Sequence, residues 1–221
     1  MNKQIKRRGI LIVLSSPSGA GKTTIAEHLL AMDPDLFRSV SATTRSPRAT
    51  ETHGVDYFFI SDDAFSKKVS EAAFAEHAKV FGAQYGTFKE TVDQTIDVGK
   101  DVLFVIDWQG TQQLSQAYAH DMVRIFILPP SFEALKDRLY NRKTDTPEII
   151  EYRVSKATDE MSHWAEYDYV VINEDLEKTI DEIHGIIKSE RLRRRRQVDL
   201  VHFVNQLRED GEPYGSFKTK L

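Results

Sequence analysis

Eight consecutive residues, Ser16–Thr23 with the sequence SPSGAGKT, constrain this chain more than any other stretch. They follow a short apolar run, Ile10–Leu14, and lead into a helix-like run that begins at Lys22. Gly19 and Gly21 let the backbone curl so that several N–H groups point inward at an anion. The helix that follows adds its positive N-terminal end. Strand, glycine-rich turn and helix in this order predict a cradle for the phosphates of a nucleotide.

The cradle gives two of its residues a specific chemistry. The Lys22 ammonium can reach the terminal phosphates, and the Thr23 hydroxyl can hold Mg²⁺. Ser16 stands where the consensus has glycine, which is dispensable there if the backbone does not need a positive φ. We expect the donor nucleotide to contact all eight residues: Ser16, Pro17, Ser18, Gly19, Ala20, Gly21, Lys22 and Thr23.

The composition limits the class of protein. The 221 residues, 40% of them hydrophobic, suffice for one large domain or for a core domain with insertions. The absence of cysteine excludes disulfides and thiolate metal sites, and it suits a reducing cytoplasm. The apolar runs are far shorter than the roughly 20 residues of a membrane span, so no membrane partner is expected. A net charge of -4 makes nucleic acid an unexpected partner.

Strand-like and helix-like stretches alternate along most of the chain. The apolar strand-like runs are Ile10–Leu14, Val102–Ile106, Val123–Leu128 and Tyr169–Ile172. The helix-like stretches are Lys22–Ala31, Gln109–Tyr118, Ser131–Asn141, Pro147–Met161 and Asp175 to about Gln197. Strands that are apolar throughout are buried on both faces, so the pattern predicts an α/β fold with a parallel sheet flanked by helices. Ligands of such sheets lie beyond the carboxyl ends of the strands.

Two parts of the chain depart from this alternation. Residues 38–90 are rich in Ser, Thr, aromatic residues and glycine turns, which predicts a mixed β region inserted into the core. The run Arg191–Arg196 is the densest basic cluster. We expect it to be the solvated end of a helix, with weak contact to RNA or to an acidic surface as the alternative. Residues 198–221 are expected to form one more short helix that frays at its end.

Six short motifs occur in the order and spacing of guanylate kinases. They are Ser41-x-Thr43-Thr44-Arg45-x-Pro47-Arg48, Gly54-x-Asp56-Tyr57-x-Phe59, Phe74-x-Glu76-x-Ala78, Gly82-x-x-Tyr85-Gly86-Thr87, Ile106-Asp107-x-Gln109-Gly110 and Phe126-Ile127-x-Pro129-Pro130-Ser131. Residues 8–190 thus resemble the bacterial-type guanylate kinase family. The resemblance implies the reaction ATP + GMP ⇌ ADP + GDP with Mg²⁺. It also implies a P-loop core of residues 8–37, 91–135 and 160–190, a GMP-binding region of residues 38–90, a helical lid at about 136–159 and a basic helical tail of residues 191–221.

The acceptor phosphate is expected to bind a pair of arginines, Arg45 and Arg48. Guanidinium groups match phosphate oxygens in pairs, and the two residues lie three apart in a turn rich in Ser and Thr. The resemblance adds the hydroxyls of Tyr57 and Tyr85 to this phosphate pocket.

The guanine base is expected to be read by Glu76. Guanine presents N1–H and N2–H₂ side by side, and an ionised carboxylate can accept from both, whereas adenine has an acceptor at N1. Ser41 and Thr87 are expected to bond the rest of the guanine edge.

Asp107 is the candidate metal residue, together with Thr23. It follows a buried strand, which is where phosphate-loop enzymes hold the Mg²⁺ shell. The family usually has Asp-x-Asp at positions 105 and 107, but here the first position is Val105. This departure puts in doubt any transfer of base contacts to position 105.

Arginines of the lid are expected to bring positive charge to the transferred phosphoryl group. The resemblance implies Arg138, Arg142 and Arg153 for this role, and Asn173 beside the adenine or ribose of ATP. Arg142 is followed by Lys143, where the family commonly has glycine. The residues expected to act in catalysis are Lys22, Arg45, Arg142 and Arg153.

Two other functions remain open at this point. One is a nucleoside monophosphate kinase for another base, against which Glu76 and Ser41 argue. The other is a non-catalytic domain that binds phosphorylated peptides, although such domains typically lose the phosphate-loop lysine and the lid arginines. The sequence leaves the oligomeric state open, and a homo-oligomer is compatible with it.

Overall fold

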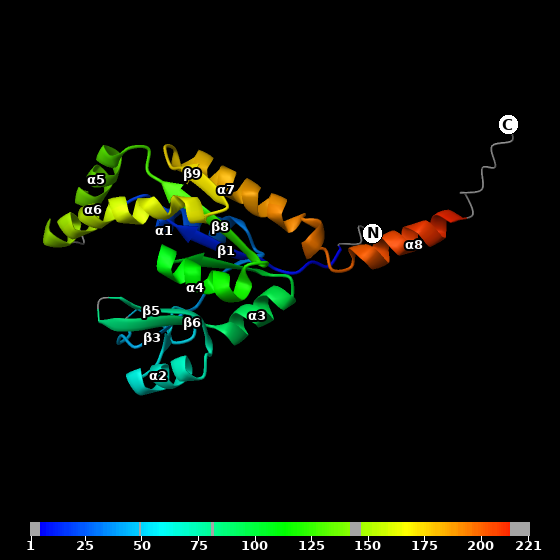
Figure 1. Ribbon diagram of the computed structural model, residues 1–221, viewed down its shortest axis with the longest axis horizontal. Coiled ribbons are helices and arrows are strands. Elements are labelled where there is room, and N and C mark those ends of the chain that lie inside the picture. The colour runs from blue at the N-terminus through cyan, green and yellow to red at the C-terminus, as the bar shows by residue number, and fades with distance from the viewer. Residues whose placement is uncertain (1–4, 49, 81, 142–146, 213–221) are drawn as a thin grey trace.

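The computed structural model describes residues 5–48, 50–80, 82–141 and 147–212 (Figure 1). Its centre is a sheet of five parallel strands in the order β2-β7-β1-β8-β9. The strands are β1 (Leu11–Ser15), β2 (Leu36–Arg38), β7 (Asp101–Val105), β8 (Met122–Leu128) and β9 (Tyr169–Ile172). Because all five run the same way, their carboxyl ends meet at one edge of the sheet.

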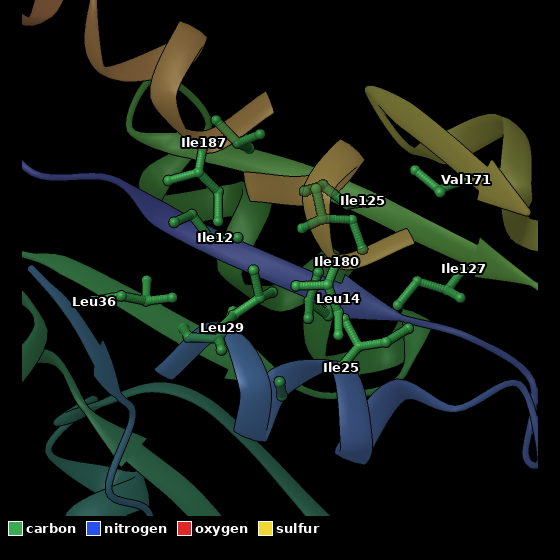
Figure 2. Packing of buried hydrophobic residues seen from close by; sticks show 14 of the residues in the cluster. Ile12, Leu14, Ile25, Leu29, Leu36, Ile125, Ile127, Val171, Ile180 and Ile187 are labelled. Atoms are coloured by element: carbon green, nitrogen blue, oxygen red, sulfur yellow. The ribbon is translucent and has the colours of Figure 1, made fainter. Parts of the chain in front are cut away.

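Helices cover both faces of this sheet, as strands that are apolar throughout require. Alternate residues of β1 point to opposite faces. Ile12 and Leu14 belong to a cluster with α1 (Lys22–Met32) and α7 (Leu176–Arg191), which Figure 2 shows from close by. On the opposite face, apolar residues pack under α3 (Lys89–Asp97) and α4 (Trp108–Tyr118); they include Leu11, Val13, Val92, Ile96, Phe104 and Leu114.

A second, four-stranded sheet in the order β4-β3-β6-β5 lies beside α4, in the lower half of Figure 1. Its elements are β3 (Ala42–Thr43), β4 (Phe58–Phe59), α2 (Asp62–Ser70), β5 (Phe74–Val80) and β6 (Ala83–Phe88). It is mixed, because β3 pairs parallel with β4 and antiparallel with β6. A small core of its own includes Phe65 and Phe74, and β5 packs against α4.

Two helices, α5 (Phe132–Tyr140) and α6 (Pro147–Ser162), form a pair at one end of the molecule (Figure 1). They share a cluster that includes Leu135, Leu139 and Ile150. A short 3-10 turn, η1 (His163–Glu166), connects α6 to β9. At the opposite end, α8 (Leu200–Gly211) extends away from the body. Within the described residues, no helix is long and apolar enough to cross a bilayer.

The expected α/β class and the inserted mixed β region are confirmed. The four expected core strands form within one residue of their expected bounds. Among the described strands and α-helices, three were not expected: the edge strand β2 and the helices α2 and α3. All three are short, and β2 exposes two of its three residues, so none carries a continuous apolar signal.

The expectation of a solvated basic helix end at Arg191–Arg196 is only partly right: Arg193, Arg194 and Arg195 are exposed, but they lie beyond the helix, and Arg196 is buried. The helix α7 stops at Arg191, and a second 3-10 turn, η2 (Arg194–Arg196), follows. Arg196 is only 2% exposed and lies 3.6 Å from the buried carboxylate of Glu190. Its burial lowers the pKa of Arg196. The cluster is therefore partly structural, because Glu190 also accepts a hydrogen bond from Tyr169 on β9.

A buried carboxylate, Asp101, anchors the end of the sheet opposite the carboxyl edge. It begins β7, has no exposed surface, and accepts hydrogen bonds from Arg7 at 2.6 and 3.0 Å. Arg191 donates to it at 2.7 Å, and the Ile10 backbone N–H donates at 2.9 Å. Arg191 also reaches Asp33, at the end of α1, at 2.8 Å. This network joins the N-terminal segment, α1, β7 and α7.

Replacing Asp101 with Asn should remove the buried charge that Arg7 and Arg191 share, and leave Asp33 as the remaining carboxylate partner of Arg191. We expect the free energy of unfolding to fall by about 3–5 kcal/mol, the usual cost of breaking a buried ion pair by removing one partner. Urea denaturation measures it. Asp97→Asn is the control, because that side chain is 61% exposed in its pair with Arg8, and exposed pairs contribute about 1 kcal/mol or less. Equal losses in the two variants would show that the network does not stabilise the fold.

Candidate active site

The phosphate loop lies between β1 and α1, at the carboxyl edge of the sheet. Gly19 has φ +90° and Gly21 has φ +99°, which L side chains rarely adopt. Gly21 caps α1 with its backbone, so the loop passes directly into the positive end of the helix. The expected cradle geometry is therefore present, and Ser16 stands outside the positive-φ positions.

Asn173, the residue after β9, joins this loop to the end of that strand. Its side-chain amide donates to the backbone oxygen of Ala20 at 2.8 Å, and its own backbone oxygen accepts from Arg138 Nη2 at 3.0 Å. Asn173 is 4% exposed. A cavity of about 360 Å³ opens beside it, lined by Gly19, Gly21, Thr24, Arg138, Asn173, Glu174 and Leu176. Arg138 Nη1 is buried without a hydrogen-bond partner, so this cavity offers a donor to a ligand.

Lys22 lies among carboxylates next to the loop. Its ammonium donates to the backbone oxygen of Ile106 at 3.1 Å. Burial lowers the pKa of Lys22, and the nearby charges of Asp107 and Glu160 oppose that shift. Asp107 caps α4 by accepting from the Gly110 N–H at 2.9 Å. These contacts hold Lys22 at the carboxyl ends of β1 and β7.

Thr23 and Asp107 line the same cavity of about 190 Å³, which also includes Lys22, Arg153 and Glu160. Neither here nor elsewhere do the described residues hold a group of three or more His, Asp or Glu side chains that could bind a metal. One hydroxyl and one carboxylate cannot fill the six-oxygen shell of Mg²⁺. The donor set fits a Mg²⁺ ion that arrives with the nucleotide and takes most of its ligands from phosphate and water.

Arg45 is held at the edge of the second sheet by Glu51. Two hydrogen bonds of 2.8 and 2.7 Å join the guanidinium to that carboxylate. They lower the pKa of Glu51 to about 2 and raise the pKa of Arg45. The guanidinium carbon lies 5.2 Å from the ring centre of Tyr57, which in turn lies 6.0 Å from the ring of Tyr85. Arg48 is exposed in the same turn, and its backbone N–H also donates to Glu51.

Glu76 lies between the second sheet and α4, and it is 6% exposed. Burial raises the pKa of Glu76, Asp107 adds to that shift, and a hydrogen bond from Thr87 at 2.7 Å opposes it. The Thr87 hydroxyl lies 3.3 Å from that of Ser41 and 3.1 Å from that of Ser39. A carboxylate and three hydroxyls therefore form one polar wall.

A cavity of about 270 Å³ opens at the carboxyl ends of β2 and β7, next to this wall. Ser39, Ser41 and Tyr57 line it, as do Arg38 and Val105. Val105 gives that side of the cavity an apolar surface where the expected motif has an acid. Arg38 is exposed and supplies a guanidinium on the same side.

The stacked rings of Trp108 and His163 join the start of α4 to the turn after α6. Their centres lie 3.8 Å apart with an interplanar angle of 10°. His163 also contacts Glu166 at 2.6 Å, and Glu166 accepts from Gln112 on α4 at 2.9 Å. This contact fixes the end of α6 beside Asp107.

The sequence-predicted residues thus gather in two adjoining places. Lys22, Thr23, Asp107, Arg138, Arg153 and Asn173 surround the phosphate loop, and Ser41, Arg45, Tyr57, Glu76, Tyr85 and Thr87 line the second sheet. Arg142 and Lys143 lie outside the described residues. Sequence reasoning missed Ser39, Arg38, Glu51 and Glu160. Glu51 could have been predicted from the sequence, because an acidic residue three positions after Arg48 is placed to pair with the arginines of that turn.

The phosphate loop at the carboxyl edge of a parallel sheet, with a second polar pocket beside it, defines a protein of the phosphate-loop class. Residues 8–190 match the family model described as guanylate kinase. The chain is 52% identical over 204 residues to guanylate kinases of Paramagnetospirillum magneticum and Maricaulis maris, covering 92% of this chain and 95% or 94% of those proteins. A crystal structure of guanylate kinase from Anaplasma phagocytophilum is 37% identical, with a TM-score of 0.72 over 91% of this chain and 96% of that one.

The chain belongs to the guanylate kinase family, and it catalyses the ATP-dependent phosphorylation of GMP to GDP.

Replacing Gly21 with Ala should loosen the donor side of the site. The new Cβ would lie 2.5 Å from Asn173 Nδ2 on a backbone with φ +99°, and the left-handed conformation alone costs about 1–2 kcal/mol. Compared with the parent protein, we expect the variant to have a lower free energy of unfolding and a higher KM for ATP. Gly185→Ala is the control, because nothing lies within 4 Å of its added Cβ and an exposed helical alanine stabilises by up to about 1 kcal/mol. A neutral Gly21→Ala would exclude the close Asn173 contact.

Proposed function

We propose that ATP binds on the phosphate loop and that GMP binds in the cavity between the second sheet and β7. One observation carries this assignment: Ile106 lines the cavity beside the second sheet, and its backbone oxygen accepts a hydrogen bond of 3.1 Å from Lys22, which lines the cavity at the loop. The two cavities therefore adjoin at the start of α4. Two nucleotides bound in this way would bring a donor phosphate and an acceptor phosphate together beside Lys22.

On the donor side, the proposal assigns the phosphates to the backbone N–H groups of residues 16–23 and to Lys22. Arg138 and Asn173 would contact the ribose or adenine, since both line the cavity next to the loop. Arg153 would contact the terminal phosphate, together with Arg142 of the lid at about 136–159. Thr23 and Asp107 would hold Mg²⁺, which supplies positive charge to the phosphate oxygens when it is bound.

On the acceptor side, Arg45 and Arg48 would bind the GMP phosphate, and Tyr57 and Tyr85 would donate their hydroxyls. Glu51 keeps the Arg45 guanidinium in one orientation before the nucleotide arrives, which reduces the entropy lost on binding. The attacking oxygen belongs to a phosphate that is already anionic. The residues thus have no proton to remove, and catalysis consists of positioning and charge stabilisation.

Base selection is assigned to Glu76, with Thr87 and Ser41 completing the contact to guanine. The ionised carboxylate would accept from N1–H and N2–H₂ together. A cytoplasmic location and the absence of a nucleic-acid partner stay part of the proposal, on the composition already described. The oligomeric state stays open.

Glu76→Gln tests the base assignment. The amide presents a donor where the carboxylate presents an acceptor, and losing a charged hydrogen bond costs about 1.5–3 kcal/mol. We expect the ratio of kcat/KM for GMP to that for AMP to fall by roughly ten- to hundred-fold. Assays with GMP, AMP, UMP and CMP measure it. Glu71→Gln, an exposed acid at the end of α2, serves as the control. An unchanged ratio in Glu76→Gln would place base selection elsewhere.

The raised pKa of Glu76 gives the same residue a pH signature. Base reading needs the carboxylate, so kcat/KM for GMP should fall as pH drops through a pKa above the ordinary glutamate range. The free energy of unfolding depends on pH in the opposite direction to kcat/KM. A raised folded-state pKa stabilises the fold at low pH, and that contribution is lost as pH rises through it. Glu76→Gln should therefore raise Tm at neutral pH and flatten the acidic limb of the kcat/KM profile. A lower Tm with an unchanged profile would contradict both expectations.

A further inference from the structure

The phosphate loop already holds an anion that belongs to the protein. The backbone N–H of Ser18 donates to Oε2 of Glu160 at 3.0 Å, although the two residues are 142 positions apart. The same carboxylate is close enough to Lys22 to oppose the lowering of its pKa. Glu160 therefore occupies part of the space in which the loop would receive a phosphate.

Two carboxylates, Asp107 and Glu160, face Lys22 in this cavity. Asp107 has reasons to stay, because it caps α4 through the Gly110 N–H and is the expected metal residue. Glu160 has no such role at the loop. Its side chain extends from α6 and is half-buried. A polyphosphate beside both carboxylates would be repelled, so the one that is not needed must leave.

We propose that Glu160 is an internal anion that competes with the donor nucleotide for the phosphate loop. In the absence of nucleotide it satisfies the Ser18 N–H and partly balances Lys22. The incoming triphosphate replaces the Glu160 carboxylate at the Ser18 N–H. This inference rests on the proposed position of ATP. The Glu160 contact makes the site selective for ligands with many contacts to the loop. A ligand with few contacts, such as inorganic phosphate, does not gain enough binding free energy to offset the loss of that contact.

The test is the dissociation constant of ATP, measured by isothermal titration calorimetry on the full chain with and without Mg²⁺. In Glu160→Gln the competing charge is gone, so ATP and ADP should bind about tenfold more tightly, the usual weight of one charge-assisted hydrogen bond. The dissociation constant of GMP should not change. Inorganic phosphate should inhibit the variant at lower concentrations than it inhibits the parent.

Glu151→Gln is the matched control, since it removes the same charge from an exposed position on the same helix; its ATP affinity should stay within about twofold of the parent. A purely structural role for Glu160 would lower Tm without tightening ATP binding. Unchanged or weaker ATP binding in Glu160→Gln overturns the inference.

Lys22→Ala separates this inference from the proposed function. If ATP lies on the loop, removing the ammonium should weaken ATP binding by about tenfold or more. Weaker binding in Lys22→Ala with no change in Glu160→Gln refutes only the internal anion. Unchanged ATP binding in Lys22→Ala refutes the donor site itself.

Discussion

The pairing of β1 between β7 and β8 is the constraint on which the rest of the molecule depends. Because the three strands are parallel, their carboxyl ends meet at one edge, where the segments after β1 and β7 line the same cavity. The phosphate loop follows β1 and Asp107 follows β7. The buried network at Asp101 holds the opposite ends of β1 and β7. Stability and chemistry thus occupy opposite edges of one sheet.

Charge balance at that edge decides what the site can accept. Lys22, Arg138 and Arg153 supply positive charge around the loop, and Asp107 and Glu160 supply negative charge. The second sheet repeats this arrangement with Arg45 and Glu51, which are paired before any ligand binds. Each proposed phosphate site is therefore partly neutralised by a carboxylate of the protein. Such pairing keeps guanidinium and ammonium groups oriented without leaving them unpaired.

The sequence predicts the core and the loop well because both are encoded locally. Continuous apolar strands and the Gly19–Gly21 turn need no distant partner to be recognised. Glu160 and Arg196 are different, because their roles arise from contacts with residues remote in sequence or in the next turn. A run of arginines has the same sequence pattern whether it is solvated or buried. Glu190 decides the outcome here, and no local rule identifies it.

The stacked rings of Trp108 and His163 hold the C-terminal end of α6 in place, so a tilt of this helix would pivot about that end. His163 follows the last residue of α6, so the stacked pair lies at the C-terminal end of the helix, beside Asp107. Glu160 is three residues from His163, or about 4.5 Å along the helix axis, and Arg153 is ten residues from it, or about 15 Å. For a given tilt, the arginine therefore travels about three times as far as the glutamate. A tilt of α6 that separates Glu160 from Ser18 would therefore change the distance between Arg153 and the phosphate that it is proposed to contact by more than it moves Glu160.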